Sequence, residues 1–494
     1  MPVLAISIDI GSTWTKGILL DADEGRILGR RSIATSQNDL SLGFSAIYES
    51  LIKEASATGS ARVSVEPEVF LSSSAKGGLR IAAIGLVPEL TLKAARLAAA
   101  SAGGKVVASY AYRLKERDLR SLGEAMPDLV LLAGGTNGGD EGYALHNARM
   151  LADSSLQAAI VFAGNEAAQD EVIRLLRSAG KRAVATHNIL PDLESLEIEG
   201  ARKAIAELFL ERIVEGKGLS KVRSLCSAEP QATPASVFNL VEALYERTWG
   251  TELDLYELRR GFLCLDLGGA TTDVYSASQA YAGDAQISCR GIPEGTIQRT
   301  VEGDLGLRIS AEHTLEQGLH LRSKNSSPLK REALASYVMR IGTDPSYLPR
   351  NSEEEDLDAF LAETCIAESL QRHAGSLEAV YTASGLRWIQ RGKDLRGIKV
   401  LIGTGGRLAQ EGSASLISSA LGTEWRGTKE GRLEERAKQI LIPSLEGLRY
   451  YRDSQYILPL VANLVGKHSE IACKIALSSL IEEPIGKEPI GDAP

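Results

Sequence analysis

The sequence has few cysteines, and no two of them are close together. The five cysteines stand at positions 226, 264, 289, 365 and 473, and the six histidines are equally scattered. Because no C-x-x-C pair occurs, the spacing favours neither a zinc ribbon nor an iron–sulfur cluster held within one chain. It is not typical of a disulfide framework either. We therefore expect no bound iron–sulfur cluster.

An excess of basic residues is also absent. The chain has 55 Lys and Arg against 64 Asp and Glu, a net charge of −9, whereas a general nucleic-acid surface needs a basic excess. No apolar stretch is long enough to span a bilayer. The N-terminal apolar run is short and contains Asp9, unlike a signal peptide. We expect a cytoplasmic protein without nucleic-acid or membrane partners.

Aromatic residues are scarce, at 5%, whereas glycine is abundant, with 48 residues among 494. Together with many Ala-rich stretches, this composition favours an α/β protein with tight turns between strands and helices. The hydrophobic content of 44% is ordinary for a soluble globular protein, and the length predicts two or more domains.

A regular alternation of strand and helix patterns begins near residue 86. The expected strands are 106–109, 129–133, 159–163 and 183–185, and the helical patterns between them are 91–101, 115–124, 141–153 and 166–179. Strands that alternate with helices predict right-handed βαβ units and a parallel sheet. We interpret residues 86–190 as a compact doubly wound domain.

The first informative motif joins two short strands, 3–10 and 17–20, by a turn with the sequence DIGSTWTK. A second stretch, FLCLDLGGATTDVYS (262–276), repeats its layout, and a third, VLIGTGGRLA (400–409), is a strand that leads into a glycine turn. In this order, the three motifs resemble those of the actin-like ATPase superfamily. The fold implied by the resemblance is an α/β protein with two lobes, each similar to ribonuclease H.

These residue types suit a nucleotide that arrives with Mg²⁺. Glycines let the main chain approach phosphates, hydroxyls and a lysine bind them, and aspartates hold Mg²⁺ through its waters. The G-x-x-x-x-G-K-[ST] spacing of a P-loop is absent. The chain therefore predicts ATP and Mg²⁺ as cofactors, held by two hairpin turns in place of a phosphate loop.

The resemblance implies a role for each residue of the first turn. Asp9 should face the Mg²⁺ water shell, and Lys16 should reach the phosphates. The cofactor-binding set of this turn is Gly11, Ser12, Thr13 and Lys16. Trp14 is expected to point away from the phosphates and to pack against a neighbouring strand.

The second and third turns receive matching roles. Asp266 should bind Mg²⁺ waters or orient the attacking water, so Asp9 and Asp266 are the expected catalytic and metal residues. The remaining cofactor-binding residues are Gly268, Gly269, Thr271, Gly403, Gly405 and Gly406. Gly405 and Gly406 should lie against adenosine, and Asp273 could simply stabilise its own turn.

A closer resemblance extends over residues 7 to 409. The carriers include VFLSSSAKGGLRIAAIGL, DLVLLAGGTNGGD, FAGNEAAQDEV and PQATPASVFNLVEAL, which sugar kinases lack. These stretches resemble the MutL family of glutamate-mutase accessory proteins, which is distinct from the mismatch-repair protein of the same name. The resemblance implies an ATP-dependent reactivating factor, with slow ATPase activity, that exchanges damaged cobalamin in an adenosylcobalamin-dependent mutase. The expected partners are the mutase subunits and ATP or ADP, and no cobalamin is expected to stay bound to this chain.

The resemblance also implies an order of domains along the chain. The expected divisions are residues 1–85 for the first part of lobe I, 86–190 for the inserted domain, 191–260 for the rest of lobe I and connecting helices, 261–480 for lobe II with a helical insertion, and 481–494 for a disordered tail.

Three alternatives use the same turns. A sugar-type kinase would need a catalytic acid for a substrate hydroxyl, which the sequence does not identify. A reductive activator of radical dehydratases would need cysteines that bridge an iron–sulfur cluster between subunits. A scaffold gated by nucleotide would bind without turnover.

Three other features of the sequence lie outside the nucleotide motifs. The glycine-rich stretch 131–152 is either a βα connection, an anion site at a helix N-terminus, or a partner surface with Asn137 and Asp140 exposed. Residues 230–244 predict a helix capped by Thr233. The lone histidines His146, His187 and His468 are expected to be surface or hydrogen-bonded residues.

Overall fold

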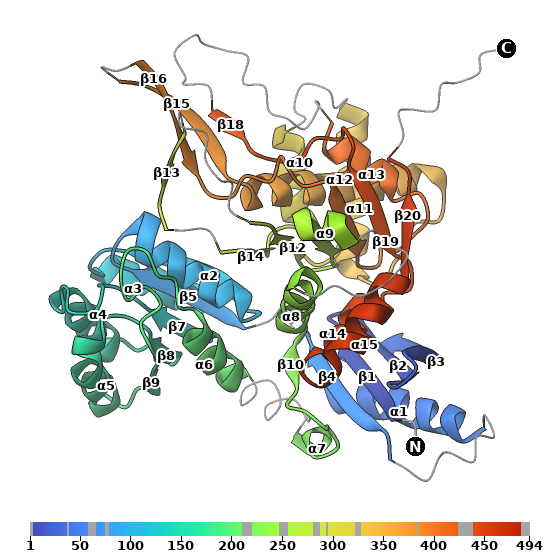
Figure 1. The fold of residues 1–494 in the computed structure, drawn as a ribbon, viewed down its shortest axis with the longest axis horizontal. Helices are drawn as coiled ribbons and strands as arrows, with labels where there is room; N and C mark the ends of the chain where they lie inside the picture. Colours follow the sequence, from blue (N-terminus) through green and yellow to red (C-terminus); the bar gives the residue numbers. More distant parts are fainter. Residues whose placement is uncertain are drawn as a thin grey trace.

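The structure is a computed structural model, and its secondary structure is organised around four β-sheets (Figure 1). It describes residues 3–36, 39–57, 66–74, 79–209, 220–246, 255–279, 287–292, 295–321, 328–382, 385–422 and 438–485. The loop of the stretch SSSAKGG lies outside these residues from position 75 to 78.

The first lobe is a five-stranded sheet with the order β10-β4-β1-β2-β3. Its central strand β1 pairs antiparallel with β2, which pairs antiparallel with β3, and β1 pairs parallel with β4 on its other side. The strands are β1 (Leu4–Ile10), β2 (Trp14–Asp21), β3 (Arg26–Ala34), β4 (Glu68–Ser73) and β10 (Gln231–Ala232). Helix α1 (Leu40–Ala57) covers one face, where Phe44 and Leu51 pack on Ile8 and Leu19 in one buried cluster.

The second lobe repeats this topology in a six-stranded sheet with the order β14-β12-β11-β17-β19-β20. Its central strand β11 pairs antiparallel with β12 and parallel with β17, as β1 does with β2 and β4. The strands are β11 (Phe262–Leu267), β12 (Thr272–Ala277), β14 (Ile297–Glu302), β17 (Val400–Thr404), β19 (Arg449–Asp453) and β20 (Leu480–Glu483). Two sheets that share one topology confirm the two-lobed actin-like fold.

Helices fill the space between the two sheets. Helix α8 (Thr233–Glu246) packs on α14 (Leu458–Ala462) and α15 (Val465–Ser478). One buried cluster joins apolar side chains of these helices to strands of both lobes, among them Ile18 and Cys264. In Figure 1 the three helices lie between the blue strands β1 and β2 of the first lobe and the sheet of the second, which contains β12 and β19.

The inserted domain is a parallel five-stranded sheet with the order β6-β5-β7-β8-β9. Its strands are β5 (Arg80–Gly85), β6 (Lys105–Ala111), β7 (Leu129–Leu132), β8 (Ala159–Phe162) and β9 (Ala183–Ala185). They confirm the four strands predicted from the sequence and add β5. Because β5 pairs with β6 and β7, this sheet begins at Arg80, earlier than the expected boundary at residue 86.

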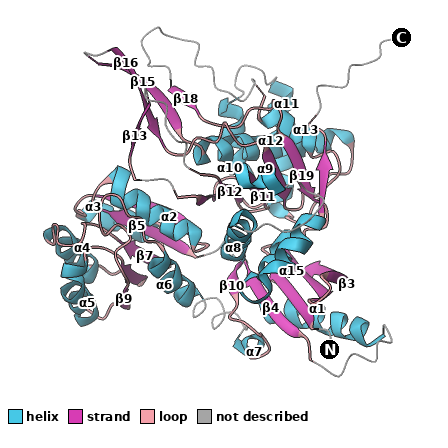
Figure 2. Cartoon of the chain, viewed as in Figure 1, coloured by secondary structure: helices cyan, strands magenta, loops and turns pink. Residues whose placement is uncertain are grey.

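Helices cover both faces of the inserted sheet, as Figure 2 shows in cyan around the magenta strands. Ala94 and Ala98 of α2 pack with Ile81 and Leu131 on one face. Leu122 and Leu151 belong to the buried cluster on the other face. The helices are α2 (Lys93–Ser101), α3 (Glu116–Glu124), α4 (Gly142–Asp153), α5 (Gln169–Ser178) and α6 (Glu199–Phe209), with short helices η1 (Pro88–Leu92) and η2 (Glu166–Ala168). The helical patterns predicted here are thus confirmed.

The sequence pattern of residues 294–393 predicts mainly helices, but the structure of this region is mixed. It contains helices α10 (Ala311–Leu321), α11 (Pro328–Thr343) and α12 (Ser352–His373), but also β14 and the hairpin of β15 (Ser376–Thr382) and β16 (Gly385–Arg391). The hairpin joins β13 (Ile287–Arg290) and β18 (Lys438–Ile440) in a fourth sheet with the order β13-β16-β15-β18. The pattern was misleading because this small sheet is largely exposed, so its strands lack a continuous apolar face.

The end of the chain is ordered further than expected. Residues 480–483 form β20, which pairs antiparallel with β19 at the edge of the second lobe. The rest of the predicted tail, from residue 486, lies outside the described residues. The other helices are α7 (Ser220–Arg223), α9 (Leu255–Arg260) and α13 (Ala414–Ala420). Within the described ranges, no helix is both long and apolar enough to cross a bilayer.

Candidate functional site

Two hairpin turns, one from each lobe, face each other. In the first, the amide of Gly11 donates to the carbonyl of Trp14 at 3.0 Å, and in the second, the amide of Gly268 donates to the carbonyl of Thr271 at the same distance. A Cβ atom built on Gly269 would lie 3.8 Å from Cγ2 of Thr13. Two turns about 250 positions apart in the sequence are therefore in near contact in space.

A cavity of about 370 Å³ lies between these turns. The predicted site residues that line it are Gly11, Ser12, Thr13, Lys16, Asp266, Gly268, Gly269, Thr271, Gly405 and Gly406. The structure thus brings together ten residues that the sequence placed in three separate motifs. A volume of this size is in the range of small-molecule sites.

The third turn is packed directly against the second. Gly405 has φ of +99°, and a Cβ atom there would lie 2.8 Å from the carbonyl carbon of Leu267 and closer still to its oxygen. An L side chain would be strained at this φ and would meet rigid backbone. Gly406 has open space where a Cβ atom would stand. Gly405 is therefore required by the backbone conformation and the close packing, whereas Gly406 leaves space in the cavity.

Asp9 is buried beneath the first turn and receives three hydroxyl hydrogen bonds. Its Oδ1 accepts from Ser72 at 3.0 Å and from Thr233 at 2.5 Å, and its Oδ2 accepts from Tyr456 at 3.2 Å. Burial raises the pKa of Asp9, while these donors and Lys16 oppose the shift. The donors come from β4, from the first residue of α8 and from the segment before α14, so Asp9 is held by segments on both sides of the lobe boundary.

Lys16 lies directly opposite Asp9 in the β1–β2 pairing. Its ammonium stands 3.1 Å from the centroid of the Tyr456 ring, a cation–π contact. Burial lowers the pKa of Lys16 to about 8, against the attraction of Asp9 and Asp266. Tyr456 itself has φ of +56°, which is uncommon for a residue with a side chain. One aromatic side chain thus contacts both charged groups of the first turn.

Asp266 occupies in the second lobe the place that Asp9 has in the first. It stands opposite Asp273 in the β11–β12 pairing and beside Thr404 in the parallel β11–β17 pairing. Burial, followed by repulsion from Asp273, raises the pKa of Asp266 to about 7. An anionic carboxylate is therefore unfavourable here unless a cation lies close by.

Asp273 does more than stabilise its own turn. Its Oδ1 accepts from Nε of Arg299 at 3.1 Å and from Nη2 at 2.5 Å, and the side chain of Arg299 is 1% exposed. Thr271 donates to its Oδ2 at 3.3 Å. A buried ion pair therefore lies next to the second turn.

A fourth aspartate, Asp453, fixes the chain that returns from the second lobe. It accepts from the amides of Ile457 and Leu458 at 2.7 and 3.0 Å and from Oγ1 of Thr404 at 2.8 Å. These bonds hold the segment that carries Tyr456 at the start of α14. Among the described residues, no group of three or more His, Cys, Asp or Glu has the geometry of direct metal ligands.

Two predicted positions differ from expectation. Gly403 is buried in β17, where a Cβ atom would lie 2.9 Å from Cε2 of the Tyr450 ring, and it is not among the cavity residues. It was selected because it belongs to a glycine-rich string, but only the part of that string after the strand reaches the cavity. Trp14 is 43% exposed and lines the cavity, whereas we expected it to pack against a strand.

Sequence reasoning missed three residues of the site. Tyr456 contacts Asp9 and Lys16, Arg299 pairs with Asp273, and Asp453 fixes the segment that carries Tyr456. They follow no glycine motif, and each lies far along the chain from the turn that it supports. Asp453 also stands at the end of a strand, but that strand, RYYRD, contains two arginines and lacks the apolar run that leads to Asp9 and Asp266.

The stretch 131–152 is held by hydrogen bonds within the inserted domain. The side chain of Asn165 bonds the amide of Gly138 and the carbonyl of Gly139, and Asn137 Oδ1 accepts from the amide of Glu166 and from Asn188. These contacts favour the structural interpretation as a βα connection. The three lone histidines are hydrogen-bonded, to Leu114, Glu166 and Glu68 respectively, as expected.

Comparison with known proteins gives a match to the family described as MutL protein over residues 5–480. Protein MutL of Clostridium tetanomorphum is 34% identical over 479 residues, which cover 96% of this chain and 98% of that protein. Among solved structures, nucleotide-free acetone carboxylase matches with a TM-score of 0.35 at 11% identity, covering 91% of this chain and 68% of that one. The activator of 2-hydroxyisocaproyl-CoA dehydratase from Clostridium difficile, with bound ADPNP, matches with a TM-score of 0.26 at 10% identity, covering 96% and 97%.

Proposed function

The chain belongs to the MutL protein family, and on that premise we propose that it is an ATP-dependent reactivating factor for an adenosylcobalamin-dependent mutase of the glutamate-mutase type. The observation that carries the nucleotide part is the cavity between the two facing turns, with the buried carboxylate of Asp9 at the first turn and the half-buried carboxylate of Asp266 at the second. The mutase part is supported by family membership together with the resemblance to glutamate-mutase accessory proteins.

The donor set fits a nucleotide bound with Mg²⁺. Ser12, Thr13 and Thr271 offer hydroxyl groups to phosphate oxygens, Lys16 offers a positive charge, and the glycines allow close approach of the backbone. Asp9 is buried and Asp266 is half-buried, and the pKa of each acid is raised, so a cation between them would favour their anionic forms. Mg²⁺, held through its waters, would neutralise phosphate charge when bound.

The residues of this chain then have separate tasks. Lys16 binds phosphate after leaving the ring of Tyr456, which is a contact it can exchange because both partners line the cavity. Asp266, which lines the cavity, orients the attacking water. Gly405 and Gly406 form the wall against which the nucleoside rests.

The two-lobed arrangement explains how such a site could act on a partner. Because its walls come from both lobes, a bound nucleotide stabilises the arrangement in which the turns are correctly spaced. A partner that prefers another arrangement of the lobes is coupled to the nucleotide by the difference in its affinity for the two states. We propose that the mutase with damaged cobalamin is that partner, and that the inserted domain contacts it.

Reactivation of an inactivated mutase tests this proposal. Glutamate mutase loaded with hydroxocobalamin is incubated with this protein, adenosylcobalamin, Mg²⁺ and ATP, and mutase turnover is followed. We expect recovery of activity with the wild type and none with Asp266→Ala, because the second turn then lacks its carboxylate. Glu49→Ala, at an exposed acid of α1 in the first lobe that does not line the cavity, is the matched control and should reactivate as the wild type does.

Two results would contradict the proposal. If Asp266→Ala folds and reactivates as well as wild type, the assignment of the second turn is wrong. If ADP forms in stoichiometric amounts only with a polyol, and a phosphorylated polyol appears, the protein is a sugar-type kinase.

A further inference from the structure

The turn between α2 and β6, residues 100–105, is the part of the inserted domain that lies against the candidate nucleotide cavity. Gly103 lines the cavity and has φ of +85°. A Cβ atom on Gly103 would lie 2.8 Å from Cβ of Ala232. Ala232 immediately precedes Thr233, whose hydroxyl donates to Asp9. The turn is therefore packed on the segment that supports the first carboxylate.

A buried arginine connects the same turn to the second hairpin. Arg299 of β14 binds Asp273 through Nε and Nη2, and its Nη1 donates to the carbonyl of Ala100 in the last turn of α2. Asp273 in turn stands opposite Asp266. One guanidinium thus joins the inserted domain to the carboxylate pair of the second lobe, in a buried site where such bonds are strong.

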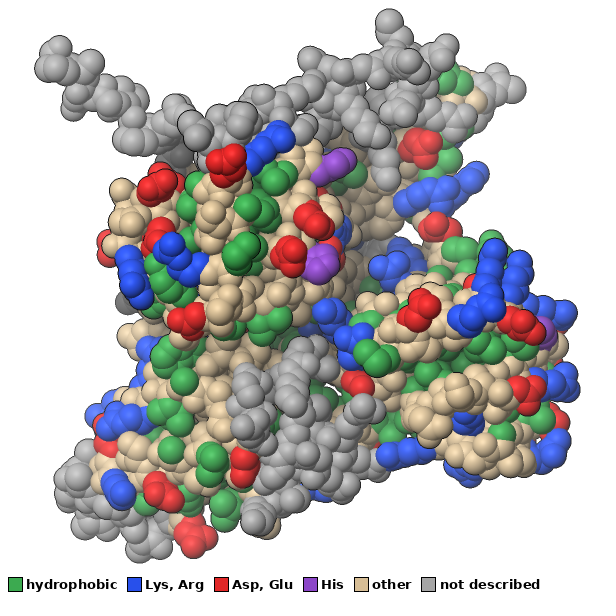
Figure 3. Space-filling view, turned by 180° about the vertical axis from the view of Figure 1, so that it is seen from behind, with side chains coloured by type: hydrophobic (Ala, Val, Ile, Leu, Met, Phe, Trp, Pro, Cys, Tyr) green, Lys and Arg blue, Asp and Glu red, His purple; other side chains and the backbone are tan. Residues whose placement is uncertain are grey.

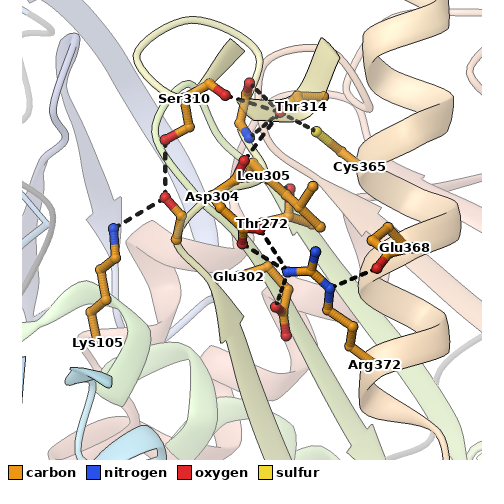
Figure 4. Close-up of polar contacts among 12 residues, drawn as sticks. Lys105, Thr272, Glu302, Asp304, Leu305, Ser310, Thr314, Cys365, Glu368 and Arg372 are labelled. Atoms are coloured by element: carbon orange, nitrogen blue, oxygen red, sulfur yellow. Dashed lines mark hydrogen bonds and ion pairs between the residues drawn. The ribbon is translucent and has the colours of Figure 1, made fainter. Parts of the chain in front are cut away.

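Lys105 provides a second connection, drawn in Figure 4. Its Nζ donates to the carbonyl of Gly303 at 3.1 Å, and Oγ of Ser310 donates to the same carbonyl at 3.0 Å and to that of Ala270 at 2.7 Å. Ala270 belongs to the second hairpin turn. A path of three hydrogen bonds therefore leads from the inserted domain to that turn.

The chain around Gly303 is fixed from the other side. Arg372 of α12 donates to Glu302 at 2.9 Å, to Asp304 at 2.8 Å and to Glu368 at 2.9 Å (Figure 4). Both neighbours of Gly303 are thereby bound to one helix of the second lobe. Residues 302–304 are thus fixed to the second lobe, so a displacement of Lys105 would move the inserted domain relative to that lobe.

Lys105 and Arg299 also line both the nucleotide cavity and a neighbouring cleft of about 1010 Å³ between the inserted domain and the second lobe. Seen from behind, the molecule is hollowed between these two parts, and Lys and Arg side chains lie at the hollow (Figure 3). Two cations that reach the nucleotide cavity are thus the same groups that hold the inserted domain.

We propose that the 100–105 turn couples nucleotide binding to the inserted domain, with Arg299 and Lys105 as the positioning residues. The inference rests on the proposed nucleotide site. Phosphates in the cavity attract both cations and hold the turn between them, so the bound state fixes the inserted domain more firmly than the free state does. Coupling of this kind typically changes an equilibrium about fivefold or more.

Amide hydrogen exchange of the full-length protein tests the coupling. Exchange is measured with and without saturating Mg²⁺ and adenylyl imidodiphosphate, and binding is measured on the same samples by calorimetry. In the wild type we expect exchange in peptides covering residues 98–111 to slow by about fivefold or more, with no change in α5. Arg299→Gln and Lys105→Met should bind the analogue more weakly but still reach saturation, and at saturation they should lose most of this nucleotide-dependent difference.

Matched controls separate coupling from loss of charge. Arg120→Gln on α3 and Lys53→Met on α1 remove exposed cations away from the cavity and should keep the wild-type difference. Arg299→Lys keeps the charge and should restore part of it, which a merely structural defect would not. If Arg299→Gln fails to fold, Lys105→Met and Arg299→Lys still decide the question.

The outcomes distinguish this inference from the function on which it rests. Wild-type protein that binds the analogue without any change in residues 98–111 overturns the coupling and leaves the nucleotide site standing. Wild-type protein that does not bind the analogue overturns both. Variants that bind the analogue and retain the full difference show that Arg299 and Lys105 are not the positioning residues.

Discussion

Replacing Gly405 by alanine should damage both the stability of the second lobe and the candidate nucleotide site. The residue has φ of +99°, and its Cβ atom would overlap the carbonyl group of Leu267, at 2.8 Å from the carbon. A left-handed φ costs an L residue about 1–2 kcal/mol, and forcing a methyl group into packed surroundings costs about 1–3 kcal/mol. We therefore expect a loss of roughly 2–5 kcal/mol.

Differential scanning fluorimetry measures this loss as a lower Tm. For a unit of 150–250 residues, 1 kcal/mol corresponds to about 2–4 °C, so Gly405→Ala should lower the Tm by roughly 4–20 °C. Because Leu267 immediately precedes the second turn, its displacement should also weaken binding of Mg²⁺ and adenylyl imidodiphosphate. The same titration monitored by calorimetry reports that affinity.

Gly406→Ala is the matched control. No heavy atom lies within 4 Å of its Cβ position, so its Tm should stay within about 2 °C of the wild-type value. Gly406 lines the cavity, and the added methyl group should still lower the nucleotide affinity. A Gly405→Ala variant with wild-type Tm would refute the steric argument. Unchanged affinity in Gly406→Ala would refute its assignment as a nucleoside contact.

Three further substitutions test other parts of the structure. Thr233→Val removes a donor to Asp9 and keeps the shape of the side chain, so it should cost about 1.5–3 kcal/mol and lower the Tm. Tyr456→Phe removes the longer 3.2 Å bond to Asp9 but keeps the ring beneath Lys16, so its Tm should fall by less than that of Thr233→Val. Burial lowers the pKa of His373 to about 3, so the unfolded state binds a proton below about pH 6.5 and the folded state does not. Stability should therefore fall by up to about 1.4 kcal/mol per pH unit below that value, and the Tm of His373→Gln should depend less steeply on pH between 6.5 and 4.5. Equal slopes for both proteins would contradict the buried neutral histidine.

The parts of the fold that the sequence predicted are those fixed by local patterns. Each lobe begins with an apolar strand that ends in Asp9 or Asp266, and the glycines and hydroxyls that follow permit only a tight hairpin. The inserted domain could also be predicted from the sequence, because buried parallel strands are short continuous apolar runs and the helices between them are amphipathic. The sequence analysis did not predict β5, although its sequence RIAAIG is mostly apolar, because nothing local assigned it to one sheet or the other.

The remainder of the site depends on contacts between distant segments. Arg299 sits in an ordinary strand, and its burial follows from the pairing of β12 with β14 and from the approach of Ala100. Tyr456 reaches Asp9 across 447 positions because Asp453 fixes the start of α14. Neither position carries a compositional signal, since a single Arg or Tyr acquires its role only when the lobes and the inserted domain are assembled.

The charges around the cavity show why nucleotide and cation should belong together. Asp266 lies near Asp9, Asp273 and Asp453, and its pKa is raised to about 7, while the pKa of Lys16 is lowered to about 8. Both shifts arise mainly from burial, so without a ligand neither the acid nor the amine is well accommodated in its charged form. An anion alone would improve the surroundings of Lys16 and worsen those of Asp266, and a cation alone would do the reverse. A phosphate group accompanied by Mg²⁺ stabilises the charged forms of both residues. The proposed ligand is therefore phosphate together with Mg²⁺, which interacts favourably with Lys16 of the first lobe and with Asp266 of the second.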